Sequence, residues 1–266
     1  MYVIAGATGR VGSATARSLL VAGATTRVLI RRPATADAWQ ERGAETRLAA
    51  LGDRDALGDA LEGCSGFFVL LPFDLTVDDL DSYADTLIAA IAGAVTDQRV
   101  PHVVMLSSGG ADLVEGTGPI TGLHRLERAL RETGTTVTAL RSGHFQEKVS
   151  DVLAVVRDTR IFPVFAASGD VRHSMVATHD LGTVAAQSLL LPPATSEAVD
   201  IIGPAYTERE VAAALGDALG RKLDVQPLPE SGWVGALLDA GFRPHVAESL
   251  AELYRRAAQH ARASVG

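Results

Sequence analysis

The sequence has a single cysteine, Cys64, among 266 residues, so an intrachain disulfide and paired-cysteine metal or redox motifs are excluded. No apolar run approaches the roughly 18 residues that a membrane-spanning helix needs. Acidic side chains outnumber basic ones by 32 to 24, and this excess disfavours non-specific binding to nucleic-acid phosphates. The opening residues lack a basic segment followed by a long apolar run, so no secretion signal is expected. These features indicate a globular, cytoplasmic protein that binds neither membrane nor nucleic acid.

Short apolar runs alternate with helical patterns through the first half of the chain. Strands are predicted over 3–5, 26–30, 45–48, 66–71, 103–106 and 136–140, with helices over 10–22, 39–42, 53–61, 80–94 and 123–131. Repeated strand–helix alternation predicts right-handed crossovers and a parallel sheet covered by helices on both faces. The expected fold class is therefore α/β, with a Rossmann-like doubly wound sheet over residues 1–150.

The pattern changes after about residue 142, where proline and glycine become frequent. Helices are predicted over 180–191, 208–219 and 247–261, and Thr207 with Glu210 fits a capping box at the start of the second. Residues 151–266 are expected to form a smaller, helix-rich region on the substrate side, with 176–202 packing back on the main sheet. Phe165 fits either the protein core or a lid over the substrate pocket. Trp233 is expected to cap the same pocket.

A glycine-rich turn directly follows the first predicted strand and opens the first predicted helix. It consists of Gly6, Ala7, Thr8, Gly9, Arg10, Val11 and Gly12. Glycines in such a turn let the backbone approach a diphosphate, and the helix amino terminus offers free N–H groups to the anion. The third glycine allows the helix to pack closely on the strand. This context predicts a dinucleotide-binding turn.

The end of the second predicted strand carries two arginines, Arg31 and Arg32. Chains that bind NAD(H) tend to place an acid at this distance from the turn, where it bonds the ribose 2′-hydroxyl. Guanidinium groups instead suit a 2′-phosphate, and Arg10 can add a third positive charge. The sequence therefore favours NADP(H) over NAD(H).

These segments together resemble the NmrA-like, atypical short-chain dehydrogenase/reductase family, including its NAD(P)H:quinone oxidoreductase-like members. The resemblance spans nearly the whole chain and includes the glycine turn and the segments at 29–33, 67–72, 103–108, 139–147 and 176–182. It implies that the cofactor is lined by Leu71, Pro72, Phe73, Ser107 and Ser108, and that 143–147 borders the substrate. The family often has Gly-Asp-Leu after the third strand, and its absence here leaves the adenine contacts unassigned.

Many short-chain dehydrogenases use a Tyr-x-x-x-Lys pair, in which the lysine lowers the pKa of the catalytic tyrosine. The only lysines here are Lys148 and Lys222, and neither lies four residues after a tyrosine. One hypothesis is an oxidoreductase that transfers a hydride from NADPH to a quinone-like or other small electrophilic acceptor. In that hypothesis His144 is the candidate catalytic residue, with His124 and His173 as weaker alternatives, because histidine titrates near neutrality and can donate a proton or a hydrogen bond. Phe73, His144 and Phe145 contact the acceptor.

The other hypothesis is a non-catalytic NADP(H)-binding protein that reports the cofactor's redox state to a protein partner. The missing Tyr-x-x-x-Lys pair fits this hypothesis equally well. No two of the seven histidines have the i, i+4 helical spacing of a zinc site, so no metal is expected. No sequence pattern identifies the acceptor or the oligomeric state.

Overall fold

A computed structural model describes residues 1–263 of the chain, with side chains described through residue 259. The last three residues of the expected C-terminal region, 151–266, lie outside this range. Seven parallel strands form the main sheet in the order β10-β6-β5-β4-β1-β2-β3. Their bounds are β1 (Tyr2–Ile4), β2 (Thr26–Ile30), β3 (Glu45–Leu48), β4 (Gly66–Leu70), β5 (His102–Ser108), β6 (Thr136–Ser142) and β10 (Glu197–Ile201). The predicted doubly wound fold is confirmed.

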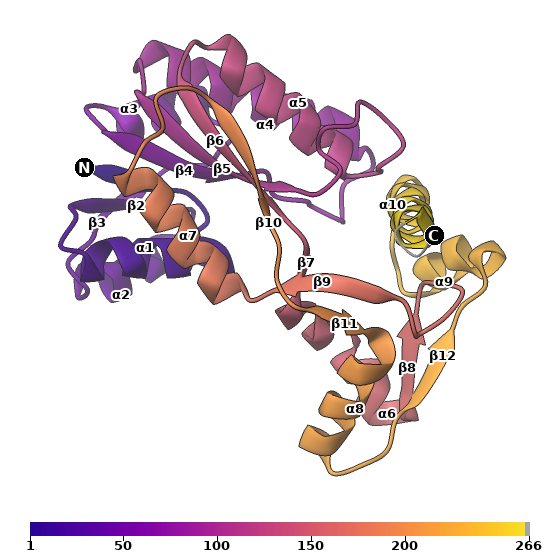
Figure 1. Ribbon diagram of the computed structural model, residues 1–266. Coiled ribbons are helices and arrows are strands. Elements are labelled where there is room, and N and C mark those ends of the chain that lie inside the picture. Colours follow the sequence, from indigo (N-terminus) through magenta and orange to yellow (C-terminus); the bar gives the residue numbers. More distant parts are fainter. Residues whose placement is uncertain (264–266) are drawn as a thin grey trace.

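Helices cover both faces of this sheet (Figure 1). One face carries α1 (Arg10–Val21), α2 (Ala36–Gln40) and α7 (Thr178–Leu190), and the other carries α3 (Arg54–Leu61), α4 (Leu80–Asp97) and α5 (Ile120–Glu132). Successive residues of β4 supply both cores. Phe67 packs in the core under α3, α4 and α5, whereas Phe68 packs in the core under α1 and α7. A strand buried on both faces explains why this segment is an unbroken apolar run.

The second half of the chain contains more β-structure than the predicted helix-rich region. Two small sheets form there from β7 (His144–Phe145), β9 (Arg172–Val176) and β11 (Ala205–Thr207), and from β8 (Ile161–Val164) and β12 (Asp224–Pro227). The remaining helices are α6 (Leu153–Thr159), α8 (Glu208–Leu219), α9 (Trp233–Asp239) and α10 (Pro244–Ala263), with 3-10 turns η1 (Pro33–Thr35), η2 (Gln146–Val152) and η3 (Glu230–Gly232). These short strands lie outside the regular strand–helix alternation that marks the main sheet, so the sequence pattern does not predict them.

One local signal in the second half predicts a helix start correctly, that of α8, whereas α7 and α10 begin two and three residues before the predicted positions and α6 and α9 were not predicted. Thr207 accepts a hydrogen bond from the Glu210 amide, and the Glu210 carboxylate accepts one from the Thr207 amide, which confirms the capping box. β10 pairs with β6 and extends the main sheet, and α7 packs on α1. Within residues 1–263, no helix combines the length and apolarity needed to cross a bilayer.

Close contacts hold α1 against the end of β1 and against α7, which packs beside it on the same face of the sheet. A Cβ atom added to Gly12 would lie 2.4 Å from the carbonyl oxygen of Gly6 and 2.6 Å from that of Ala5. On the other side of α1, a Cβ added to Gly182 of α7 would lie 2.4 Å from the Cβ of Ala14. The sequence assigned Gly12 to close packing of helix on strand, and the structure confirms that assignment.

We predict that Gly12→Ala lowers the free energy of unfolding by about 1–3 kcal/mol, because the added methyl group would meet backbone that cannot rotate away. Urea denaturation of the purified variant measures this change. Gly235→Ala is the matched control, since Gly235 lies in α9 with no atom near its missing Cβ. The control should be neutral or stabilising by up to about 1 kcal/mol. Equal stability of Gly12→Ala and wild type would contradict the packing argument.

Candidate functional site

The glycine turn leaves β1 and reverses into α1 at the carboxyl edge of the sheet. Gly6 has a positive φ of 67°, which glycine adopts without strain. A side chain at Gly6 would also collide with Leu70 of β4, whose Cδ2 lies 2.5 Å from the position of the missing Cβ. The Gly9 amide donates to the Gly6 carbonyl at 2.8 Å and closes the turn. Two neighbouring strands therefore fix the shape of this turn.

The exposed surface of the turn is formed by Thr8, Gly9 and Arg10, whereas Ala7 and Val11 are buried and anchor it. Within residues 1–263, the amino terminus of α1 has neither a side-chain cap nor an acid in its first turn. By contrast, α3, α4 and α8 are capped by Asp53, Asp79 and Thr207. The α1 terminus thus keeps uncompensated N–H groups and a partial positive charge, which suit an anion.

Arg10 lies in this turn, and the two other arginines of the predicted site follow β2, the strand that pairs with β1. Arg31 and Arg32 directly follow β2 and are exposed. Thr76 and, more weakly, Arg31 lower the pKa of Asp74, so the loop after β4 lies near the Arg31 guanidinium. Arg10 is also exposed, and its guanidinium donates to the Ser150 hydroxyl at 2.9 Å. Arg10 therefore links the turn to η2.

The segments after β4 and β5 end at the same edge of the sheet as the glycine turn. Leu71 is buried, Pro72 is half-buried, and Phe73 is 45% exposed. The two serines at the end of β5 differ in their surroundings. Ser107 is buried and donates to Glu127 at 2.6 Å, whereas Ser108 is half-buried and donates to the Gly109 carbonyl at 3.2 Å. The Ser107 hydroxyl is thus committed to the protein interior.

Glu127 is the centre of a buried polar network that sequence reasoning did not single out as functional. Its carboxylate, on α5, accepts hydrogen bonds from Ser107 and from Arg141 of β6, the latter at 2.8 and 3.1 Å. Glu127 raises the pKa of Arg141 and keeps it charged. An acid among the apolar positions of α5, between Leu123 and Leu130, is the sequence signal that could have revealed this network. The network fixes the carboxyl ends of β5 and β6 relative to α5.

His144 and Phe145 form β7, which pairs with β9 just beyond the main sheet. The protein around His144 displaces part of its hydration and, together with the charge of Lys148 and the nearby His173, lowers its pKa to about 4. The imidazole still reaches solvent. It is therefore neutral near pH 7 and offers one N–H donor, which corrects the expectation that it titrates near neutrality. Phe145 is half-buried against the core beside α1 and α7.

Glu147 connects this segment to the start of α7. Its carboxylate accepts from the Thr178 hydroxyl at 2.6 Å and from the Thr178 amide at 3.0 and 3.1 Å. Burial raises the pKa of Glu147, but these hydrogen bonds outweigh burial and leave that pKa below its usual value. A carboxylate at the amino terminus of α7 also complements the helix dipole. Glu147 thereby holds His144 and η2 against the sheet.

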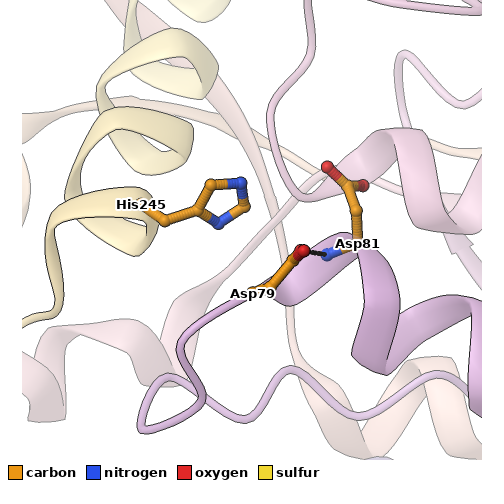
Figure 2. Close-up of side chains that lie close together, drawn as sticks. All are labelled: Asp79, Asp81 and His245. Carbon is orange, nitrogen blue, oxygen red and sulfur yellow. Dashed lines mark hydrogen bonds between the residues drawn. The ribbon is translucent and has the colours of Figure 1, made fainter.

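A separate group of potential metal ligands lies at the amino terminus of α4, where Asp79 and Asp81 approach His245 of α10 (Figure 2). The Asp79 carboxylate caps α4 through the Asp81 and Ser82 amides and also accepts from the Ser82 hydroxyl. Asp81 pairs with Arg125 at 2.8 Å. The His245 Nδ1 accepts from the Leu80 amide at 3.5 Å. These contacts account for the group as a capped helix start onto which α10 docks.

Comparison with known proteins finds relatives and solved structures that are named as nicotinamide-dependent reductases. NAD(P)H azoreductase of Xenophilus azovorans is 28% identical over 255 residues, which are 96% of this chain and 86% of that protein. The crystal structure of an NADPH-dependent quinone oxidoreductase from Escherichia coli, complexed with NADPH, superposes with a TM-score of 0.83 at 24% identity. That match covers 98% of this chain and 90% of the other.

Citrobacter sp. triphenylmethane reductase, complexed with NADP(H), superposes with a TM-score of 0.77 at 21% identity, covering 96% of this chain and 88% of the other. These structural matches establish the shared fold. The model of the NmrA-like family matches residues 2–265, which confirms the resemblance found in the motifs. The chain belongs to the NmrA-like family.

Proposed function

We propose that this protein is an NADPH-dependent oxidoreductase that reduces a quinone-like or other small electrophilic acceptor. The observation that carries the proposal is the open glycine turn at the uncapped amino terminus of α1, with Arg31 and Arg32 exposed beside it. The relatives add support, because they are named as an NAD(P)H azoreductase and an NADPH-dependent quinone oxidoreductase.

The described residues fit NADPH in charge and shape. The amides at the start of α1 are suited to the diphosphate, and the tight turn that presents them depends on Gly6, whose positive φ and contact with Leu70 leave no room for a side chain. Arg31 and Arg32 are suited to the 2′-phosphate, since each guanidinium can donate two hydrogen bonds to one phosphate. Leu71, Pro72, Phe73 and Ser108 follow β4 and β5 at this edge and would line the nicotinamide side, with Ser107 contributing backbone only.

Reduction of a quinone by NADPH does not require a strong acid or base from the protein. Bound NADPH supplies a hydride, and a quinone that receives it needs one proton, which water can provide. The chain therefore needs mainly to orient the acceptor near the cofactor. His144 would donate a hydrogen bond from its neutral ring to an acceptor oxygen, and Phe73 would cover part of the acceptor. No Tyr-x-x-x-Lys pair is required for this reaction.

The first prediction is that the purified protein oxidises NADPH when a simple quinone is added, with one hydroquinone formed per NADPH consumed. Loss of NADPH absorbance across a panel of quinones and azo dyes measures it. A calorimetric titration of the same preparation with NADPH serves as the control for cofactor binding. Tight NADPH binding without turnover of any acceptor would contradict the proposal that the protein is an enzyme. It would favour the hypothesis of a non-catalytic NADPH-binding protein.

The second prediction concerns cofactor choice. Arg31→Ala and Arg32→Ala should each weaken NADPH binding about tenfold or more, because a charge-assisted hydrogen bond to phosphate is lost. NADH binding should change less than twofold. Calorimetric titrations with both nucleotides measure the ratio, and Arg17→Ala, at an exposed position further along α1, is the matched control. Equal loss for both nucleotides would rule out the 2′-phosphate contact.

The third prediction concerns His144. Because its pKa is about 4, the wild-type kcat/KM should show no inflection from this residue between about pH 5.5 and 8. His144→Phe removes the N–H donor and should lower kcat/KM about three- to tenfold, while His144→Gln should retain most of it. An inflection near pH 6.5 that His144→Gln abolishes would show instead that the imidazole titrates during turnover.

A further inference from the structure

The strand that carries His144 leads from the main sheet into a second, three-stranded sheet. β6 ends at Ser142, which lies opposite Ser108 at the end of β5, and β7 begins two residues later at His144. β7 pairs with β9, and β9 pairs with β11 on its other side. Consecutive and paired strands therefore join the edge where β5 and β6 end to the small sheet (Figure 1).

The register of this small sheet places His173 on the same face as His144. His144 lies opposite Met175 of β9. Residues directly opposite each other on paired strands share a face, and so do residues two apart on one strand. His173 is two residues before Met175, so its side chain projects to the same side as that of His144. The two positions are one strand apart and about 7 Å apart along the strand direction, which makes them adjacent groups on one surface.

The other face of the small sheet packs against the protein core. Phe145 lies opposite Val176, and both pack in the core beside α1 and α7. His144 and His173 have the opposite orientation in the pleat and therefore project away from that core. Their exposure agrees with this, since His144 is exposed and His173 is half-buried. Met175 is buried on their face, and the two imidazoles reach beyond it to solvent.

The fold leaves the ring nitrogens of both histidines available to a ligand. Among residues 1–259, no protein group forms a hydrogen bond with the ring of His144 or His173. By contrast, the Nδ1 of His124 donates to the Ala111 carbonyl at 2.9 Å. Burial lowers the pKa of His173, and the ring of His173 in turn adds to the burial and Lys148 charge that lower the pKa of His144. Both rings are therefore neutral near pH 7, and each offers one N–H donor.

We infer that His173 is a second hydrogen-bond donor of the acceptor site, and that His144 and His173 together favour acceptors with two separated carbonyl oxygens, as in 1,4-quinones. This inference rests on the proposed function, in which His144 bonds the first oxygen. The sequence offers His173 only as an alternative to His144, whereas the register places both on one surface. A donor displaced along that surface reaches a second oxygen only when the acceptor carries one away from the first. Uncharged donors suit a quinone, because no ion has to be desolvated when it binds.

The first test compares His173→Phe, His173→Gln and wild type with 1,4-naphthoquinone as the acceptor. His173→Phe removes the donor but keeps a planar ring, so it should raise KM about three- to tenfold. His173→Gln keeps an N–H donor and should stay within about twofold of wild type. Melting temperatures of the same preparations should agree with wild type, which separates a lost contact from a damaged fold.

A ligand with one oxygen is the matched control for the second contact. 1-Tetralone keeps the bicyclic skeleton with a single carbonyl, and it is measured as a competitive inhibitor against 1,4-naphthoquinone. Because His144 alone satisfies that carbonyl, His173→Phe should change the inhibition constant of 1-tetralone less than about twofold. Equal losses for the quinone and for 1-tetralone would overturn the two-oxygen contact.

Imidazole ¹⁵N resonances give a readout that needs no turnover. 1,4-Naphthoquinone added to the NADP⁺-loaded protein should shift the ring resonances of both His144 and His173. Their absence in His144→Gln and His173→Gln assigns them. The ring of His102, which is buried and bonded to Thr138, is the internal control and should not shift.

The outcomes separate the two proposals. Turnover by wild type, with an unchanged naphthoquinone KM in His173→Phe and an unmoved His173 resonance, would overturn the second donor and leave the oxidoreductase intact. Shifts of both rings on naphthoquinone binding, without any NADPH oxidation, would support the pair of donors and overturn the proposal that the protein is an enzyme.

Discussion

The contact between the first helix and the first strand determines where the positive end of α1 lies. Gly12 brings α1 against the carbonyl groups of Ala5 and Gly6, and Gly6 turns the chain beside Leu70 of the neighbouring strand. Together they place free amides at the point where the strand order reverses between β1 and β4. In doubly wound sheets this is the position where ligands bind. The arginines, the loops after β4 and β5, and α7 are arranged around this contact.

Buried and partly buried polar groups beneath the site fix the positions of the strand ends and the helix that form it. Glu127 is buried with Arg141 and Ser107, and all its strong partners come from strands that end at the site. An acid–arginine pair of this kind costs desolvation, so its benefit lies in fixing one arrangement of β5, β6 and α5. Glu147 does the same for the segment that carries His144, by bonding the first residue of α7. The exposed residues of the site are therefore held in place by partly buried networks whose polar groups are hydrogen-bonded.

Much of the main domain could be predicted from the sequence, because its signals are local. The bounds of β2 and β3 agree with prediction, and α1 begins at Arg10 as expected, since a glycine turn and a buried apolar run are readable without tertiary information. The small sheets of the second half could not be predicted. Their strands, such as His144–Phe145, exist only because partners distant in the chain lie beside them. The packing of Phe165, Trp233 and Tyr254 against one another has the same origin, since these residues meet only in the folded chain.

Backbone amide chemical shifts during an NADPH titration test the central claim most directly, because they report on the turn itself. The account predicts that the largest ¹H–¹⁵N shifts at saturation belong to the first three amides of α1, those of Arg10, Val11 and Gly12, where the diphosphate meets the start of the helix. The amides at the amino edge of the sheet should be unaffected. Saturation by NADPH with these three resonances unmoved would contradict the account.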